Sequence, residues 1–421
     1  PIHSLLSGPA SGVTAASTLG LMLDSPNLLT MDMGGTSTDI SIVRNGKAII
    51  SQQGKVGDFP IIMPVVAIEA IGAGGGSIAW MDAGVLKVGP HSAGARPGPA
   101  CYDKGGTLPT LSDAYLLCGF LDETKPLASD IVLRRDLAER AMQPIADALG
   151  TDVRAAAASC ILVGTSNMLA KAAPFIARIG SSPADLTLMI FGGAGAIHGP
   201  LLAAEMGIGK IIVPRKSSVF CAFGGLVTDL LYDAVTSARG QPLSSEMVRQ
   251  AYAKMRVAAA EWLQKQAPTI KPEYEYSANL RYIGQSFDVS TAIPASVGHD
   301  GDIEAMASAF HDEHERLFLH AHRNSEIEAV AFQLRVRGVL PSPGKDTGEA
   351  GAHAGIPSST PRKLFIGGNL YDALCYDQES LPDGWSAEGP AVITQTTATT
   401  VVPPDFKVNL DQFGDLIMER I

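Results

Sequence analysis

The sequence lacks features that define several classes of protein. Its longest run of Lys and Arg is two residues, and 43 Asp and Glu outnumber 32 Lys and Arg, which gives a net charge of −11. A protein that binds the phosphates of nucleic acids needs a basic surface, so we exclude nucleic acid as the main partner. Uninterrupted apolar runs also stop short of the roughly 18–20 uncharged residues of a membrane helix, so we predict no membrane span.

Cysteine is scarce as well. The five cysteines are odd in number and widely spaced, and no two of them form a Cys-x-x-Cys pair. This pattern indicates free thiols in a reducing cytoplasm, and it argues against a disulfide framework or a structural zinc finger. The chain begins at Pro1 without a basic and apolar leader, so we expect a cytoplasmic protein whose sequence starts partway through a larger gene product.

What is present describes a folded protein with a large core. Hydrophobic residues make up 46% of the 421 residues and charged residues 18%, a balance typical of two to three globular domains. The 44 glycines are concentrated in clusters beside apolar segments. Such clusters mark turns where the backbone comes close to another group, and they lie at 34–35, 72–76, 89–106 and 192–199.

Hydrophobic periodicity predicts the main elements of the first half. Residues 28–43 indicate a β-hairpin with a polar glycine tip, and residues 136–178 indicate helices, the longer one capped by Asp152. An apolar run at 186–191, a glycine turn, a helix at 198–206 and a strand at 210–213 together predict a βαβ-like unit.

The second half continues with alternating structure and ends in short strands. We predict a strand at 274–282, where aromatic or apolar residues alternate with polar ones, an exposed helix at 300–322 with four histidines, and a strand at 328–340. The segment 341–361 is rich in Gly, Pro, Ala and Ser and indicates a linker. Short strands then follow, at 369–376, 391–394, 399–402 and 415–418.

The tip of the predicted hairpin has the chemistry of a phosphate site. Gly34 and Gly35 let the backbone approach an anion, Thr36 and Thr38 offer hydroxyl donors, and the flanking carboxylates can hold magnesium through water. Those carboxylates are Asp32 and Asp39. The alternative is an ordinary polar hairpin tip.

A second glycine turn strengthens the phosphate hypothesis. Gly192, Gly193 and Gly195 follow an apolar run, and two glycine turns at strand ends can hold opposite ends of one nucleotide.

A third group of residues could bind a metal. Cys101, Asp113 and His198 are competent zinc ligands, although no short spacing links them. The alternative gives Cys101 and His198 packing roles and makes Asp113 a helix N-cap. The histidines at 311, 314, 320 and 322 are expected to lie on a solvated helix and not to bind metal.

Several ordered motifs resemble one known family. They are Ser-Gly-Pro-Ala at 7–10, Asp-Met-Gly-Gly-Thr-Ser-Thr-Asp at 32–39, Gly-Gly-Gly-Ser-Ile-Ala at 74–79, 89–95, Pro-Gly-Pro-Ala-Cys-Tyr at 97–102, Phe-Gly-Gly-Ala-Gly at 191–195 with His198, and Leu-Arg-Tyr-Ile-Gly-Gln at 280–285. In content and order these motifs resemble the hydantoinase A / 5-oxoprolinase family, which also contains β subunits of ketone carboxylases. The resemblance covers essentially the whole chain.

The resemblance implies an α/β actin-like ATPase fold, with ATP and Mg²⁺ as cofactors. It implies that Asp32 organises magnesium, that Thr36 and Asp39 share the catalytic site, that residues 34–38 hold phosphates, and that residues 192–195 support the adenosine. Full-length members carry an N-terminal block with another Asp-x-Gly-Gly-Thr motif. This chain matches the second clamp and lacks that block, so we expect it to be a fragment or one subunit of a split enzyme.

The activity implied by the resemblance is ATP-dependent hydrolysis of a cyclic amide, such as hydantoin or 5-oxoproline, in a hetero-oligomer with the upstream half or a B-type subunit. One alternative is the β subunit of an acetone or acetophenone carboxylase, and another is a non-catalytic piece with the same fold. Zinc is a further candidate cofactor at Cys101, Asp113 and His198. We expect an ATPase region at 1–340, the linker at 341–361 and a small β-rich C-terminal module at 362–421.

Overall fold

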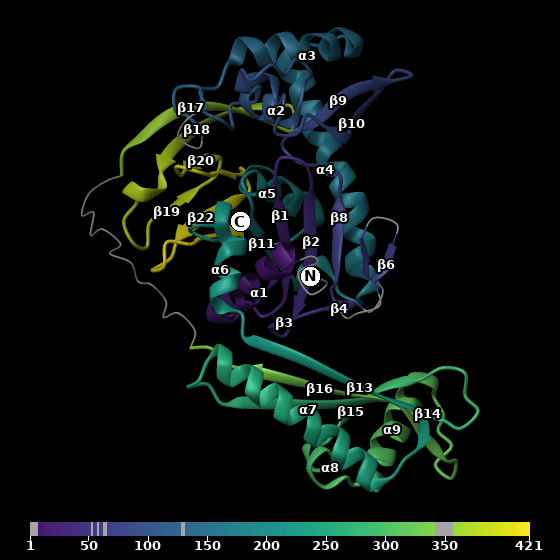
Figure 1. The fold of residues 1–421 in the computed structure, drawn as a ribbon. Helices are drawn as coiled ribbons and strands as arrows, with labels where there is room; N and C mark the ends of the chain where they lie inside the picture. Colours follow the sequence, from purple (N-terminus) through teal and green to yellow (C-terminus); the bar gives the residue numbers. More distant parts are fainter. Residues whose placement is uncertain (1–6, 52–53, 57–58, 62–64, 128–130, 342–356) are drawn as a thin grey trace. The chain divides into compact units, whose positions relative to one another are not determined.

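The computed structural model describes residues 7–51, 54–56, 59–61, 65–127, 131–341 and 357–421. The chain divides into two compact units (Figure 1). Unit 1 is formed by Pro1–Leu226 with Pro343–Ile421, and unit 2 by the continuous segment Val227–Ser342. Unit 2 is therefore inserted in the sequence of unit 1.

Unit 1 is built on a nine-stranded mixed sheet. The strand order is β19-β22-β23-β12-β11-β1-β2-β3, and β8 pairs with β2. Strands β1, β11 and β12 are parallel neighbours, while β1 and β2 form the predicted antiparallel hairpin. The strands are β1 Leu28–Met33, β2 Thr38–Arg44, β3 Lys47–Ala48, β8 Ile68–Ile71, β11 Thr187–Phe191, β12 Lys210–Val213, β19 Ser386–Glu388, β22 Phe406–Leu410 and β23 Leu416–Arg420.

Helices cover both faces of this sheet, because alternate residues of the strands pack in separate apolar clusters. Leu28 of β1 packs in one cluster with Val13 and Phe220, whereas Met31 belongs to the other cluster with Met168 and Leu202. The helices are α1 Ser7–Met22 and α6 Phe220–Val227 on the first face, and α2 Leu111–Leu117, α3 Arg135–Leu149, α4 Val153–Arg178 and α5 Gly195–Met206, which contribute to the second cluster. The architecture is a mixed α/β fold.

The predicted helices and the βαβ-like unit are confirmed. Residues 136–178 form α3 and α4, separated where Gly150 adopts a left-handed backbone conformation with φ of 66°. Asp152 caps α4 by accepting a hydrogen bond of 2.8 Å from the Ala155 N–H. Helix α5 joins β11 to its parallel neighbour β12.

Helix α4 differs from the expectation in one respect. It is long and apolar enough, by length and composition alone, to cross a membrane, although the sequence analysis predicted no such segment. Its buried residues include Cys160, Met168 and Phe175, which lie in the larger apolar cluster of unit 1. The packing of this helix in the core accounts for its apolar composition, since core helices pass the same test.

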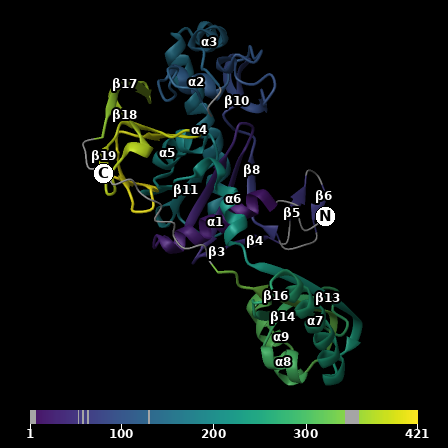
Figure 2. The same cartoon turned by 60° about the vertical axis from the view of Figure 1, so that its left-hand side comes forward.

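The expected division at residue 340 is wrong. The short C-terminal strands exist where they were predicted, but β23 pairs antiparallel with β12, so residues 406–420 extend the main sheet of unit 1. Figure 2 shows the yellow C-terminal part of the chain beside the teal and purple elements of unit 1, which are far away in sequence. The backbone groups of β12 would otherwise form a sheet edge, and their pairing explains why the segment folds with unit 1. Most of the predicted linker, 342–356, lies outside the described residues.

The remaining strands of unit 1 form smaller sheets. Strands β17, β18, β20 and β21 form a four-stranded sheet, and β9 pairs with β10. Their bounds, with those of the short strands and 3-10 helices, are β4 Ile50–Ser51, β5 Gly54–Val56, β6 Phe59–Ile61, β7 Val65–Val66, β9 Ser77–Asp82, β10 Val85–Ser92, β17 Ser359–Ile366, β18 Asn369–Asp377, β20 Ala391–Thr394, β21 Thr399–Val402, η2 Ala100–Tyr102, η3 Pro183–Asp185, η4 Ser217–Val219 and η5 Gln378–Ser380.

Unit 2 is a four-stranded antiparallel sheet with helices packed on it. The strand order is β13-β16-β14-β15, and the predicted strand at 274–282 is confirmed as β14, with Tyr276, Ala278 and Leu280 buried. The elements are β13 Leu230–Pro242, α7 Ser245–Gln266, β14 Pro272–Tyr282, β15 Val289–Ile293, α8 Ala295–Asp300, α9 Ile303–Phe318 and β16 Ile327–Gly338.

The expectation of four exposed histidines on the 300–322 helix is wrong. Helix α9 ends at Phe318, and His311 and His314 on it are buried, at 6% and 3% exposure. The Tyr282 hydroxyl lies 2.9 Å from His311 Nδ1, and its oxygen accepts a hydrogen bond from the His322 N–H. The Tyr282 hydroxyl oxygen accepts from His322, so its proton is available for a hydrogen bond to Nδ1 of His311. Because this ring nitrogen has a partner, His311 can be buried.

His198 of α5 is a buried polar group that links three helices of unit 1. Its Nδ1 lies 2.7 Å from the Tyr115 hydroxyl of α2, and its Nε2 lies 3.1 Å from Thr165 Oγ1 of α4. The Thr165 hydroxyl donates to the Ile161 carbonyl, so the ring must carry its proton on Nε2 and accept from Tyr115. Burial lowers the pKa of His198 to about 4.

We predict that His198 makes unit 1 less stable in mild acid. The unfolded imidazole takes up a proton below about pH 6.5, whereas the folded one stays neutral to about pH 4. The contribution to stability is therefore complete above pH 6.5 and is lost as the pH falls towards 4, with a loss of about 2 kcal/mol at pH 5. Urea unfolding at pH 7.5 and pH 5 measures it. The variant His198→Gln does not titrate and should lose less stability between these pH values, and an equal loss in both proteins would contradict the prediction.

Candidate active site at the ends of β1 and β11

Two carboxylates face each other where β1 ends. Asp32 is the second-last residue of β1 and pairs in register with Asp39 of β2. Side chains of directly opposed residues lie on one face of the sheet, with Cβ atoms about 5 Å apart, and like charges at such positions are destabilising. Asp32 shares the face of Leu28, which α1 and α6 cover. A pair of like charges that destabilises the fold in this way is characteristic of a functional site.

The environment of these carboxylates favours a bound cation. Burial raises the pKa of Asp32, partly offset by a hydrogen bond of 3.2 Å from the Cys221 thiol to Asp32 Oδ2. Burial also raises the pKa of Asp39, and the neighbouring charge of Asp32 raises it further. Two carboxylate groups are the oxygen ligands that magnesium prefers, and a cation between them would relieve their repulsion. The donor set therefore fits a magnesium ion.

The hairpin tip at 34–37 is held against a second glycine segment. The Gly34 N–H donates to the Ser37 carbonyl, and the N–H groups of Gly75 and Gly76 donate to the carbonyls of Gly34 and Gly35 at 3.0 and 2.6 Å. A Cβ atom on Gly74 would lie 2.8 Å from backbone atoms of residues 35–37. Backbone contacts thus hold most of the tip, and the Ser92 hydroxyl adds a hydrogen bond of 3.4 Å to the Gly35 carbonyl.

The residues predicted to contact phosphate differ in accessibility. Gly35 and Thr36 are exposed at the tip, as a ligand contact requires. Thr38 is fully buried, and its hydroxyl donates to the Ala73 carbonyl at 2.6 Å. The prediction that Thr38 offers its hydroxyl to phosphate is therefore wrong, because that proton joins the tip to residue 73.

The second glycine turn lies directly beside Asp32. Gly192 has φ of 84°, and a Cβ atom there would lie 2.5 Å from both Asp32 Oδ1 and the Met33 carbonyl oxygen. The Ala194 N–H donates to that same carbonyl at 3.0 Å. The structure therefore brings the two predicted glycine turns together, and Gly192 is required by the approach of Asp32.

The other two glycines of this turn have unlike surroundings. Gly193 is exposed, and no heavy atom lies within 4 Å of the place of its Cβ atom. Gly195 is buried, and a Cβ atom there would lie 2.9 Å from Ile190 Cγ2, so this glycine serves the packing of α5 on β11. Of the three glycines predicted to support adenosine, Gly193 is the one with open space beside it.

The structure does not assemble Cys101, Asp113 and His198 as a zinc site. Asp113 accepts hydrogen bonds from the Cys101 N–H at 2.7 Å and from the N–H and hydroxyl of Thr110. Thr110 is the N-cap of α2, and Asp113 completes the capping box as its third residue. Both ring nitrogens of His198 face hydroxyl groups. Within the described ranges, no cluster of three or more His, Cys, Asp or Glu side chains could hold a metal ion.

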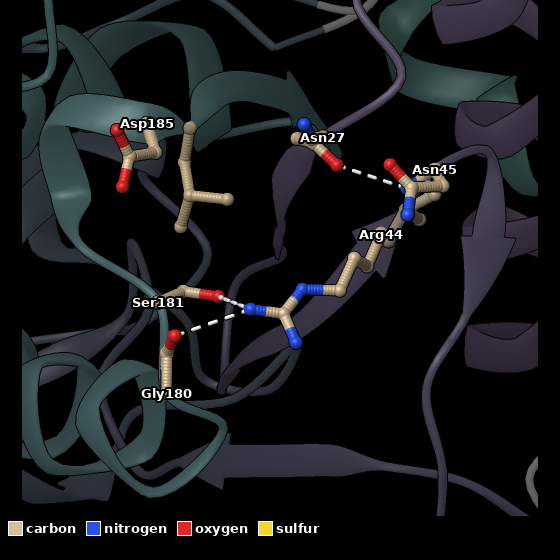
Figure 3. Close-up of a pocket in the computed structure, with 8 residues that line it drawn as sticks. Asn27, Arg44, Asn45, Gly180, Ser181 and Asp185 are labelled. Carbon is tan, nitrogen blue, oxygen red and sulfur yellow. Dashed lines mark hydrogen bonds between the residues drawn. The ribbon is translucent and has the colours of Figure 1, made fainter.

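A cavity of about 140 Å³ lies at the other end of β1 (Figure 3). Arg44 donates from Nη2 to the Gly180 carbonyl at 3.1 Å, and Asn27 and Asp185 also line the cavity. Asn27 precedes β1, so the cavity is separated from Asp32 by the length of that strand, roughly 15 Å. It is not part of the candidate active site.

Sequence reasoning missed Cys221 as a member of the site. The residue lies on α6, which follows β12, a parallel neighbour of β11. Residues that follow parallel strands gather at one edge of a sheet, and this rule was the signal that could have placed Cys221 near Asp32. The pairing of β11 with β12 was needed to apply it.

Comparison with known proteins identifies relatives of this chain. The alpha subunit of caprolactamase from Pseudomonas jessenii is 33% identical over 97% of this chain and 60% of its own length. A nucleotide-free structure of acetone carboxylase, from a study of ATP-dependent acetone carboxylation, superposes with a TM-score of 0.83 at 26% identity, over 98% of this chain and 61% of that one. The structure of the ATP-dependent caprolactamase from P. jessenii superposes with a TM-score of 0.75 at 31% identity, over 98% of this chain and 61% of that one.

The chain thus spans about 60% of the length of these relatives. The sequence profile described as Hydantoinase/oxoprolinase matches residues 1–234, and the profile of the Hydantoinase/oxoprolinase C-terminal domain matches residues 237–419. Together the two profiles cover nearly the whole chain. The chain belongs to the hydantoinase/oxoprolinase family.

Proposed function

We propose that this chain contributes an ATP-dependent phosphoryl-transfer site to an enzyme that hydrolyses a cyclic amide. The observation that carries the proposal is the Asp32–Asp39 pair beside two glycine turns. The family and the ATP-dependent caprolactamase support it. We further propose that the α/β architecture of unit 1 is an actin-like ATPase fold, in line with strands and helices that place both turns at one end of β1 and β11.

The residues of the site have distinct roles in this proposal. Magnesium, when bound, neutralises phosphate charge and orients the transferring group. Asp32 and Asp39 would hold it through water. The exposed backbone of Gly35 and the Thr36 hydroxyl would contact the phosphates, and the open side of Gly193 would lie towards the adenosine. Thr38, Gly74 and Gly192 would keep these groups in place.

The chemical reason for using ATP lies in the substrate. Resonance makes an amide carbonyl a poor electrophile at neutral pH. Transfer of the γ-phosphoryl group to the carbonyl oxygen would release ADP and give an imidate-like phosphate ester. Water would then add to that carbon, and the C–N bond would break, so that the ring opens, the nitrogen leaves as the amine and an acyl phosphate remains. A second water would hydrolyse the acyl phosphate to the carboxylate and inorganic phosphate. The enzyme contributes mainly positioning and charge stabilisation to the transfer.

We propose that the active protein is a hetero-oligomer. The caprolactamase relative is an alpha subunit, and the matched relatives are longer than this chain. A nucleotide cleft with two phosphate clamps would then take one clamp from residues 32–39 and the other from the upstream half or a partner subunit.

The acetone carboxylase structure favours a second candidate function. In that case the same site would serve a subunit of an ATP-dependent ketone carboxylase. A non-catalytic chain with the same fold is a third candidate.

Phosphate release from Mg·ATP distinguishes these functions. We would measure it with 5-oxoproline, hydantoin or a larger lactam, for this chain alone and with the upstream half and B-type subunit added. Release stimulated by one ring in the reconstituted sample would establish the hydrolase. Release that needs bicarbonate together with a ketone would establish the carboxylase, and no nucleotide binding in any sample would leave the non-catalytic role.

We predict that Asp32→Asn lowers Mg·ATP turnover about 100-fold or more, because the amide cannot supply the negative charge that holds magnesium. The matched control is Asp185→Asn, which alters a carboxylate at the remote cavity and should leave turnover within about twofold. Neither variant should unfold at a lower temperature than the wild type, since Asp32→Asn removes one of two repelling charges. A folded Asp32→Asn protein with wild-type turnover would refute the assignment.

We predict that Gly74→Ala displaces the hairpin tip. Its methyl group would meet three backbone atoms at 2.8 Å, none of which a side-chain rotation can move. Overpacking of this kind costs about 1–3 kcal/mol, and turnover should fall with it. Gly209→Ala is the control, since no heavy atom lies within 4 Å of its Cβ position. Chemical denaturation measures the difference, and equal stability of the two variants would speak against a fixed tip.

A further inference from the structure

The Cys221 thiol is in direct contact with the proposed magnesium-binding carboxylate. Its Sγ lies 3.2 Å from Asp32 Oδ2. A carboxylate has no proton to give, so the thiol donates and the carboxylate accepts. Among the hydrogen bonds of the described residues, the Cys221 thiol is the side-chain group that donates to the Asp32 carboxylate. The other four cysteines are buried, whereas Cys221 is half-exposed at the site.

We propose that Cys221 is a positioning residue, whose S–H···O hydrogen bond holds the Asp32 carboxylate in one orientation for cation and nucleotide binding. The inference rests on the function proposed above and adds a residue to that site. It depends on three features of the packing: how the thiol is fixed, how the other carboxylate oxygen is fixed, and why the donor is sulfur.

The thiol is fixed because α6 lies directly on α1. The Ser11 hydroxyl donates to the Cys221 carbonyl at 2.7 Å, which anchors the backbone of residue 221. A Cβ atom on Gly12 would lie 2.8 Å from Cys221 Sγ, so the glycine leaves just enough room for the sulfur. Gly224, one turn further along α6, has no space for a side chain against the Ser11 backbone. The sulfur position is therefore set by two helices and not by a mobile side chain.

The other oxygen of Asp32 is fixed by the second glycine turn. Gly192 approaches Asp32 Oδ1 so closely that a Cβ atom would lie 2.5 Å from it. Asp32 is thus confined between the turn after β11 on one side and Cys221 on the other. If the thiol were removed, rotation about the Asp32 side-chain bonds would be restrained on one side alone.

The thiol suits this position because it is an uncharged donor. A strong donor such as an ammonium group would neutralise the carboxylate that the cation needs. The thiol orients Asp32 and leaves its charge available. A hydroxyl in the same place would also orient the carboxylate.

The test compares Cys221→Ala with Cys221→Ser in the full chain assembled with its partner. The two variants differ by one oxygen atom, so a loss of packing affects both and a loss of the hydrogen bond affects one. We expect Cys221→Ala to raise the Mg²⁺ concentration for half-maximal ATP binding about 5–10-fold, with kcat lowered more than KM is raised, and Cys221→Ser to stay within about twofold of the wild type. Equal behaviour of both variants, impaired or unimpaired, would overturn the positioning role.

A second measurement tests the hydrogen bond without nucleotide. The S–H stretch absorbs in an infrared window free of other protein bands, and the Cys221 band is identified by its absence from Cys221→Ser. We expect this band to move to higher frequency in Asp32→Ala, which lacks the acceptor. An unmoved band would overturn the inference. If the wild-type assembly bound no Mg·ATP while the band moved, the proposed function would fail and the Asp32–Cys221 contact would stand.

Discussion

Close approach of backbone segments around Asp32 is the constraint on which the candidate site depends. Four segments meet there: the hairpin tip after β1, the loop at 73–76, the turn after β11, and α6. Each of the first three lies so near its neighbour that a single Cβ atom at Gly74 or Gly192 would collide with backbone or with the carboxylate. The parallel pairing of β1 with β11 holds the two turns at one edge of the sheet. Backbone contacts are stiffer than side-chain contacts, so a site built on them keeps its geometry before any ligand arrives.

Much of the fold could be predicted from the sequence where one local pattern determined the structure. The hairpin at 28–43, the helices at 136–178 and the strand β14 followed from periodicity and capping. The domain boundary could not, because the Gly- and Pro-rich segment before β17 is typical of a linker, whereas the pairing of β23 with β12 is a long-range contact without a local signal. The burial of His311 could not be predicted for the same reason. Its partner, Tyr282, lies on another element.

Site prediction succeeded for residue types with one evident chemistry and failed where the local role was ambiguous. Asp32 and Asp39 meet, as a carboxylate on each side of a glycine tip suggests. Thr38 has the same side chain as Thr36, but Thr38 is the first residue of β2 and is buried, with its hydroxyl donating to the Ala73 carbonyl, whereas Thr36 lies in the exposed turn. The proposed zinc ligands have structural partners instead: the Asp113 carboxylate accepts the hydrogen bonds of the α2 cap, and both ring nitrogens of His198 face hydroxyl groups. The ligand chemistry of a residue predicts a site when no structural partner competes for it.

The insertion of unit 2 also has a consequence for synthesis of the chain. Strand β12 is made before unit 2, and its partner β23 is made after it, with about 200 residues between them, as between Arg215 and Asp415. During translation, the backbone N–H and C=O groups on the β23 side of β12 therefore stay unpaired while the whole of unit 2 is synthesised. An exposed strand edge invites pairing with other chains. The order of the sequence thus makes the nascent chain a candidate for chaperone protection until β23 leaves the ribosome.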